Sequence, residues 1–208
     1  MIFREFCESY KQTFKIFSEY WKKYGKLKGL VTSPYFSISV ALTLLMLHYW
    51  LTEKWWETAL NILPNIFGFS LGGYAVVLAF GDEKFREKLG TTKNNESVSA
   101  YLTISSTFAH FIIIQIIALI LALLAKAFDF KYLFNDQIEK IIQILIPIGY
   151  GIGFFFFIYA ILSALAATMG IFRISMWHNA FIEQQKQKDL QNQPSSEKKI
   201  NEGKNIIS

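Results

Sequence analysis

The chain has 208 residues, of which 52% are apolar and only 18% are charged, and its formal net charge is +5. An average soluble domain has about 25% charged residues, so this composition argues against a water-soluble globule, including Rossmann enzymes, nucleic-acid-binding proteins and disulfide-stabilised secreted domains. Charged residues are absent from residues 29–52, 58–81, 97–125 and 141–172. Each of these stretches exceeds the roughly 20 helical residues that cross a bilayer. The sequence therefore predicts an all-α, polytopic membrane protein with four transmembrane helices.

Residues 1–30 are predicted to form an amphipathic helix that lies in the membrane interface. Phe14, Phe17 and Trp21 belong to an aromatic face at helical spacing, and charged residues, mostly lysines, occupy the opposite side. Such a helix fits the headgroup plane, where basic groups meet anionic lipids. The same spacing also resembles heptads, so docking on a sister subunit or on another protein is the alternative.

The transmembrane domain is expected over residues 31–182, with spans at about 33–52, 56–80, 98–127 and 141–172. Trp55 and Trp56 belong to an aromatic cluster that is expected at the outer membrane interface. The last helix is expected to extend into the cytoplasm through Trp177, a candidate contact for the membrane interface or a partner. Residues 183–208 contain no aromatic residue and are rich in Gln, Lys, Asn, Ser and Glu, which is typical of a disordered tail.

The basic residues predict the orientation in the membrane. Seventeen Lys and Arg residues lie before the first span, between the second and third spans or after the fourth, whereas four lie in the other two connections. The positive-inside rule then places both termini in the cytoplasm. The expected location is the inner, cytoplasmic membrane.

Polar and small residues recur along the predicted spans. Two sets stand out, a polar stripe of Asn61, Asn65, Ser106 and His110, and candidate helix-packing positions at Gly68, Gly72, Gly149 and Gly153. One interpretation is that both sets are contacts between helices, since small residues let backbones approach and polar ones hydrogen-bond across the interface. The other is that the polar stripe faces a water-filled path. Because four helices enclose little space, such a path requires several copies of the chain.

The sequence gives little support for catalysis or cofactor binding. Residues 68–72 match the G-x-S-x-G pattern around Ser70, and His110 would be its natural partner in an intramembrane serine hydrolase. That pattern has meaning on a strand-turn-helix, whereas here it lies within an apolar stretch. With one cysteine and three scattered histidines, no metal site and no cofactor are expected.

These observations predict a non-enzymatic, homo-oligomeric membrane sensor, anchor or effector that acts on a cytosolic protein and has no direct contact with nucleic acid. An oligomeric ion channel or pore lined by spans two and three is the alternative, and a serine hydrolase is a third. In architecture alone, the four-span arrangement resembles small membrane subunits of bacterial antiphage systems, among them that of Kiwa. This resemblance implies a role in antiviral defence.

Overall fold

The computed structural model describes residues 2–91, 99–129 and 136–192, and these residues form eight α-helices and no β-strand. The all-α prediction is confirmed. The helices are α1 (Ile2–Tyr24), α2 (Lys26–Val31), α3 (Pro34–Leu45), α4 (Leu47–Thr52), α5 (Trp55–Ala79), α6 (Glu83–Gly90), α7 (Ala100–Ala127) and α8 (Asp136–Asn192).

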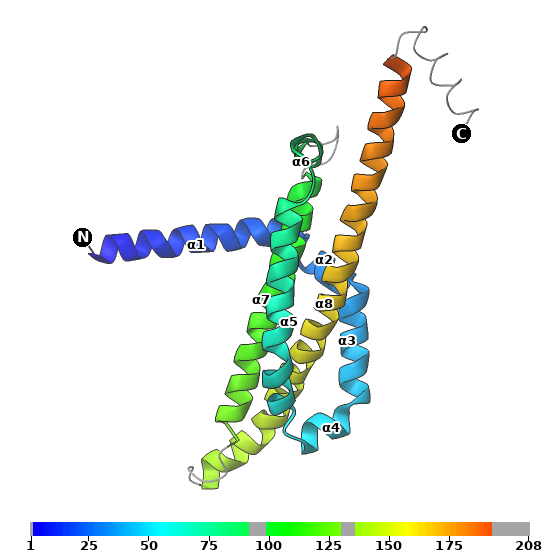
Figure 1. Ribbon diagram of the computed structural model, residues 1–208. Coiled ribbons are helices and arrows are strands. Elements are labelled where there is room, and N and C mark those ends of the chain that lie inside the picture. Colours follow the sequence, from blue (N-terminus) through cyan, green and yellow to red (C-terminus); the bar gives the residue numbers. More distant parts are fainter. Residues whose placement is uncertain (1, 92–98, 130–135, 193–208) are drawn as a thin grey trace.

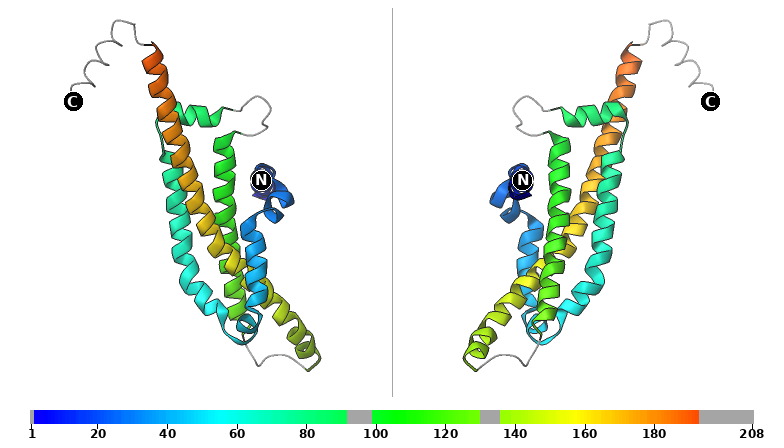
Figure 2. Two further views of the ribbon diagram at one scale, coloured as in Figure 1. Left: turned by 90° about the vertical axis from the view of Figure 1, so that its right-hand side faces the viewer. Right: turned by 90° about the vertical axis from the view of Figure 1, so that its left-hand side faces the viewer.

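Three helices are long and apolar enough to cross a membrane, namely α5, α7 and the part of α8 from Leu145 to Gln191. They run side by side along the length of the molecule, and each of them packs on the other two (Figures 1 and 2). α3 packs against α8, but it has only 12 residues, or ~18 Å of helix. The bundle therefore consists of three long helices and one short one.

α1 departs from the bundle and lies across it. In Figure 1 it projects sideways from the long helices, and its contacts with the bundle are made to α7. Gly25 follows α1 with a φ of 101°, in the left-handed region that favours glycine, and so it allows the chain to change direction. The short α2 then leads to α3, where Pro34 occupies the first turn. Proline fits this position because an N–H in the first turn has no acceptor within the helix.

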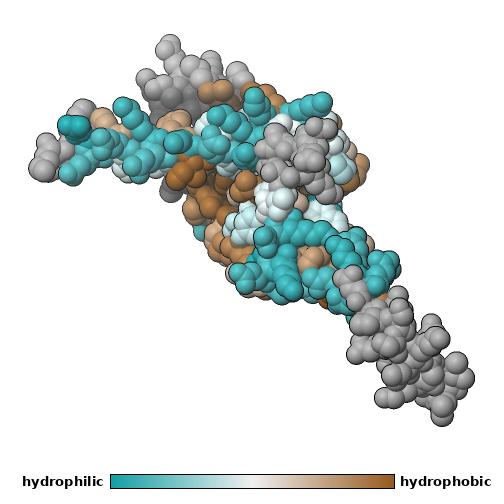
Figure 3. Space-filling model, turned by 90° about the horizontal axis from the view of Figure 1, so that it is seen from above, coloured by the Kyte–Doolittle hydropathy of each residue, from teal (hydrophilic) through white to brown (hydrophobic). Residues whose placement is uncertain are grey.

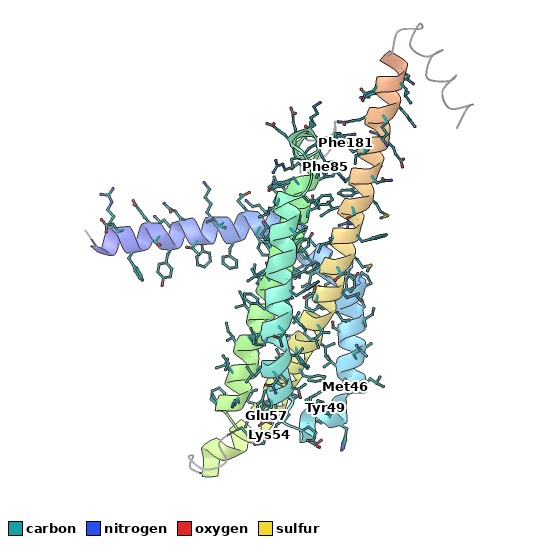
Figure 4. All side chains as sticks on the ribbon, in the orientation of Figure 1. Met46, Tyr49, Lys54, Glu57, Phe85 and Phe181 are labelled. Carbon is teal, nitrogen blue, oxygen red and sulfur yellow. The ribbon has the colours of Figure 1, made fainter. Side chains whose placement is uncertain are left out.

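The first predicted span, residues 33–52, is not one straight helix. The chain bends at Met46, between α3 and α4, and α4 turns to pack on α8 (Figure 4, where Met46 and Tyr49 are labelled). Nε1 of Trp50 donates to the carbonyl oxygen of Thr43 at 2.9 Å, an acceptor that a continuous helix would give to the N–H of Leu47. A side chain that takes an acceptor from the helical ladder is a known cause of a sharp bend.

Tryptophans and glycines interlock where α4 and α5 meet α8. Trp55 is 0% exposed and Trp56 only 3%, so these two residues pack within the chain, and their predicted place at the level of the outer membrane interface stays a prediction. A Cβ at Gly153 would lie 2.7 Å from Cη2 of Trp55, and one at Gly151 would lie 3.1 Å from Cη2 of Trp50. The two glycines of α8 provide the space that both indoles occupy.

α8 is longer than the predicted fourth span. It continues to Asn192, so residues 183–192, which were expected to begin a disordered tail, are helical, and residues 193–208 lie outside the described residues. Gln, Lys and Glu are good helix formers. Because extending an existing helix avoids the cost of nucleation, a polar segment without a core can still continue it.

Replacing Gly153 with alanine is expected to lower the free energy of unfolding by about 1–3 kcal/mol, the usual cost of overpacking, because the new Cβ would meet the ring of Trp55. Gly149→Ala is the matched control, since a Cβ at this position would meet no neighbouring element within 4 Å in the part of the chain that the structure describes. Thermal unfolding in detergent, followed by circular dichroism, measures the difference. Equal melting temperatures for the two variants would contradict the interlocking.

Candidate functional site

The side chain of His110 joins three helices. It lies on α7 and is 2% exposed. Its Nδ1 is 2.7 Å from the hydroxyl of Tyr20 on α1, and its Nε2 is 2.9 Å from the hydroxyl of Tyr159 on α8. The ring of Tyr24 stacks on the imidazole with the centroids 3.9 Å apart. These four residues, the tyrosine–histidine junction, attach the C-terminal end of α1 to the bundle.

A neutral imidazole satisfies the junction, because it donates a hydrogen bond through one ring nitrogen and accepts one at the other. Its apolar surroundings favour this neutral form. Burial also raises the pKa of Tyr20 and that of Tyr24 above the ordinary tyrosine value. The phenols therefore stay protonated at neutral pH and available as hydrogen-bond donors.

A second polar cluster lies deeper in the bundle. Nε2 of Gln115 on α7 donates to Oγ of Ser70 on α5 at 2.8 Å and to Oγ of Ser163 on α8 at 3.3 Å. All three side chains are buried, with at most 1% exposed. Among the described residues, Oε1 of Gln115 has no hydrogen-bond partner. A single amide thus links the three long helices by hydrogen bonds, which are strengthened by the low local dielectric.

The pair that a serine hydrolase would need is divided between these two clusters. Ser70 accepts a hydrogen bond from Gln115, and both ring nitrogens of His110 face tyrosine hydroxyls. A nucleophile and its base must lie within hydrogen-bond reach of each other. The structure does not bring Ser70 and His110 into that arrangement.

A third cluster joins α6 to the far part of α8. Phe85 of α6 is 2% exposed, and its ring centroid lies 4.9 Å from that of His178 and 5.4 Å from that of Phe181. Nζ of Lys88 donates to Oε1 of Gln184 at 2.8 Å and lies 4.9 Å from the centroid of Phe181. Figure 4 shows Phe85 and Phe181 together at one end of the molecule. α6 and residues 173–192 of α8 form one unit, which we call the α6–α8 arm.

The residues of the predicted polar stripe do not share one surface. Asn61 and Asn65 are exposed on α5, with Nδ2 of Asn65 3.4 Å from the carbonyl oxygen of Asn61. Ser106 and His110 are buried on α7, and Oγ of Ser106 donates to the carbonyl oxygen of Thr103. In the single chain, two of the four face outward and two face neighbouring helices.

The predicted packing glycines lie in different surroundings. Gly153 borders the ring of Trp55, whereas a Cβ at Gly68, Gly72 or Gly149 would have, among the described residues, no heavy atom within 4 Å outside its own stretch of helix backbone. The packing role of the last three stays a prediction, and within one chain no neighbouring helix approaches them.

The predicted aromatic contact residues divide between surface and interior. Phe14 and Phe17 are exposed on α1, and Trp21 is half-buried near the junction. Trp177 is exposed on the arm, with the guanidinium of Arg173 5.4 Å from its ring centroid. These four residues are therefore accessible, in contrast to Trp55 and Trp56.

Sequence reasoning missed Tyr20, Tyr24, Tyr159 and Gln115. Gln115 carries a detectable signal, because it is an amide in the middle of a strongly apolar helix, where polar side chains usually face a partner. The tyrosines carry no such signal, since three of ten tyrosines in a chain rich in aromatic residues cannot be singled out by spacing.

No known protein family matches the chain, and no curated protein or solved structure is significantly similar to it. Within residues 2–91, 99–129 and 136–192, no group of three or more His, Cys, Asp or Glu residues is placed to hold a metal ion.

The three side-chain clusters described above hold α1, the bundle and α6 relative to one another.

Tyr20→Phe is expected to loosen α1 from the bundle. The change removes the hydroxyl that hydrogen-bonds to Nδ1 of His110, and a buried polar atom without a partner costs about 1–3 kcal/mol. Hydrogen–deuterium exchange along α1 is expected to rise in this variant. It should stay unchanged in Tyr10→Phe, whose side chain is exposed on the same helix. Equal exchange in the two variants would show that the junction does not hold α1.

Proposed function

We propose that the chain is a non-enzymatic, four-span protein of the inner membrane that anchors a cytosolic protein or exchanges a signal with it. The observation that carries this proposal is the α6–α8 arm. α8 leaves its uncharged stretch at Arg173 and continues to Asn192, which adds ~30 Å of helix. Because Phe85 and Lys88 of α6 contact this extension as far as Gln184, its first turns are held beside the bundle, as a docking platform requires.

The charge distribution supports a cytoplasmic location for the arm. The segments assigned to the cytoplasm carry seventeen of the 21 Lys and Arg residues. At the opposite end of the bundle, Nζ of Lys54 is 2.7 Å from Oδ2 of Asp129, and this carboxylate raises the pKa of Lys54 by its hydrogen bond. Figure 4 shows Lys54 and Glu57 at the end remote from Phe85 and Phe181. One of the few basic residues assigned to the outside is thus paired with an acidic one.

The polarity of α1 supports its placement in the inner interface. α1 meets α7 at His110, sixteen residues or ~24 Å of helix before Lys126, so the proposal requires residues 100–109 of α7 to extend beyond the hydrocarbon layer. In Figure 4, aromatic rings extend from one side of α1 and nitrogen-tipped side chains from the other, and Figure 3 views its hydrophilic side from above. Phe14 is 75% exposed and Phe17 53%. The boundary between headgroups and acyl chains would bury both rings.

The first span of the proposal, residues 33–52, combines α3 and α4. α3 alone has 12 residues, and its ~18 Å is shorter than the hydrocarbon layer. The proposal therefore requires α4, which contains Tyr49 and Trp50, to lie in the outer interface, where aromatic residues are enriched.

The double variant Cys7→Ser, Glu8→Cys can report the orientation, because Cys7 is the single cysteine of the chain and Glu8 is exposed on the polar side of α1. A membrane-impermeant maleimide is expected to label this variant in inverted membrane vesicles and not in intact spheroplasts. The double variant Cys7→Ser, Glu53→Cys moves the thiol to the connection assigned to the outside and should give the opposite pattern. Labelling of the first variant from the outside would overturn the proposed topology.

The arm offers a mixed surface for a protein partner. Met176, Ile182 and Leu190 are between 38% and 57% exposed, and charged side chains such as Lys186 and Asp189 lie among them. Apolar contacts within a polar rim are typical of protein interfaces. The arm therefore has both the rigidity and the surface for a cytosolic partner.

The double variant Ile182→Glu, Leu190→Glu is expected to abolish co-purification of a cytosolic partner with the full chain from mild detergent, because two charges would enter the apolar part of the contact. The double variant Gln187→Glu, Gln191→Glu adds the same charge to the same segment at exposed polar positions and is expected to retain the partner. Quantitative mass spectrometry compares the two. Equal recovery from both variants, or a wild-type chain recovered alone, would contradict the anchoring role.

Self-association is the second part of the proposal, and the exposed amides of α5 favour it. Asn61 and Asn65 lie on the outside of an apolar helix, where an amide without a partner costs about 2 kcal/mol or more. Asparagine side chains hydrogen-bond readily between membrane helices, and a second copy of α5 would supply the partners. An oligomer built in this way is also the arrangement that the channel alternative needs.

Light scattering in detergent is expected to give a multiple of the 24.0 kDa chain mass. The mass should fall toward the monomer in Asn65→Leu and stay high in Asn65→Gln, which keeps the amide. A monomeric wild-type protein would contradict self-association through α5.

A further inference from the structure

A cleft of about 750 Å³ lies in the angle between α1 and the N-terminal part of α7. Lys15 and Lys23 lie on its α1 side, Ser105 on its α7 side, and Tyr74 of α5 also contributes to its lining. The volume fits a ligand the size of a lipid headgroup or a small metabolite. The cleft faces the polar side of α1 and belongs to none of the clusters described above, although Tyr20 lines its inner end.

The charges around the cleft favour an anion. Lys15 and Lys23 are eight residues apart, so they lie on the same side of α1. Glu19 also lines the cleft between them, and its Oε1 is 3.3 Å from Nζ of Lys22, which lies outside the lining. Among the described residues, no ion pair engages Lys15 or Lys23. The cleft therefore holds two lysines and one carboxylate, and because Lys22 pairs with that carboxylate, the balance of charge stays positive.

Neutral donors complete the chemistry. The amide of Gln12 and the hydroxyl of Ser105 line the same cleft, and hydroxyls and amides beside lysines are common ligands of phosphate oxygens. The apolar side chains of Ile16 and Leu102 also line it, which suits a ligand that has a phosphate and a less polar remainder.

We infer that this cleft binds a phosphate-bearing anion at the inner membrane surface. The inference rests on the proposed location of α1 in the cytoplasmic interface. The phosphate belongs either to the headgroup of an anionic phospholipid or to a soluble compound. Because Tyr20 lines the cleft and also hydrogen-bonds to His110, an occupant touches the residue that attaches α1 to the bundle. Ligand binding is therefore coupled to the docking of α1, which gives the membrane protein a means of sensing the phosphate.

One experiment in two parts tests the inference with the full chain. In the first, native mass spectrometry measures lipid retained by protein taken from nanodiscs of phosphatidylcholine mixed with phosphatidylglycerol. In the second, inorganic phosphate and glycerol phosphate are titrated onto the detergent-purified protein, with tyrosine and tryptophan fluorescence as the readout. Selective retention of phosphatidylglycerol identifies a lipid as the source of the phosphate, and saturable binding in the second part identifies a soluble compound. The absence of both overturns the inference.

Matched variants localise the binding. Lys15→Gln with Lys23→Gln is expected to weaken binding about tenfold or more, in keeping with the loss of charge-assisted hydrogen bonds. Arg4→Gln with Lys11→Gln removes the same charge from α1 outside the cleft lining and is expected to change binding less than about twofold. If the two double variants lose binding equally, the anion is attracted by the overall positive charge of α1, and the proposed site in the cleft is wrong.

A second pair of variants preserves the lysines. Ser105→Asp places a carboxylate in the cleft and is expected to abolish binding, whereas the isosteric Ser105→Asn should largely retain it. Binding of soluble phosphate in detergent depends on neither the orientation nor a partner protein. If the anchoring proposal is wrong, this measurement can still detect phosphate binding. If both parts of the binding experiment fail, only the phosphate site is contradicted.

Discussion

The arrangement of the helices depends on two polar side chains buried on α7. His110 and Gln115 are five residues apart and almost fully buried, and their hydrogen bonds reach α1, α5 and α8. Between apolar helices in lipid, hydrophobic burial alone distinguishes poorly between one packing arrangement and another, since the lipid is as apolar as the side chains. A polar group in that medium must find its partner, because leaving it unpaired is costly. These two residues therefore specify which face of α7 meets each neighbour.

Interlocking at the opposite end of the bundle complements this polar specification. Trp50 and Trp55 fit against glycines of α8. The indole N–H of Trp50 also donates to the carbonyl oxygen of Thr43, which lacks its helical partner because the chain bends at Met46. The same side chain thus fills space and satisfies the backbone where α3 ends. Close packing at this end and hydrogen bonding along α7 together hold α8 in one direction. That direction is carried into the α6–α8 arm through a continuous helix.

The two proposals meet at α1 and the arm, both on the side of the bundle assigned to the cytoplasm. Tyr20 belongs to the tyrosine–histidine junction and to the phosphate cleft, and α7 leads from this junction toward the packing of α6 and α8. A ligand that changes how firmly α1 is attached would act on a helix that contacts both. The physical requirement for such coupling is differential binding between attached and detached α1.

Sequence alone determined the all-α class, the apolar helices α5, α7 and α8 and the distribution of basic charge, because helical length and the absence of charge are properties of a single segment. It also marked Gly153 as a packing position and His110 as an unusual polar group. Only the tertiary structure decided that Trp55 and Trp56 are interior, that the first predicted span bends at Met46, and that His110 is paired with tyrosines far from it in the chain. These outcomes depend on which faces of distant helices meet, and one sequence without its contacts does not encode that choice in any local pattern.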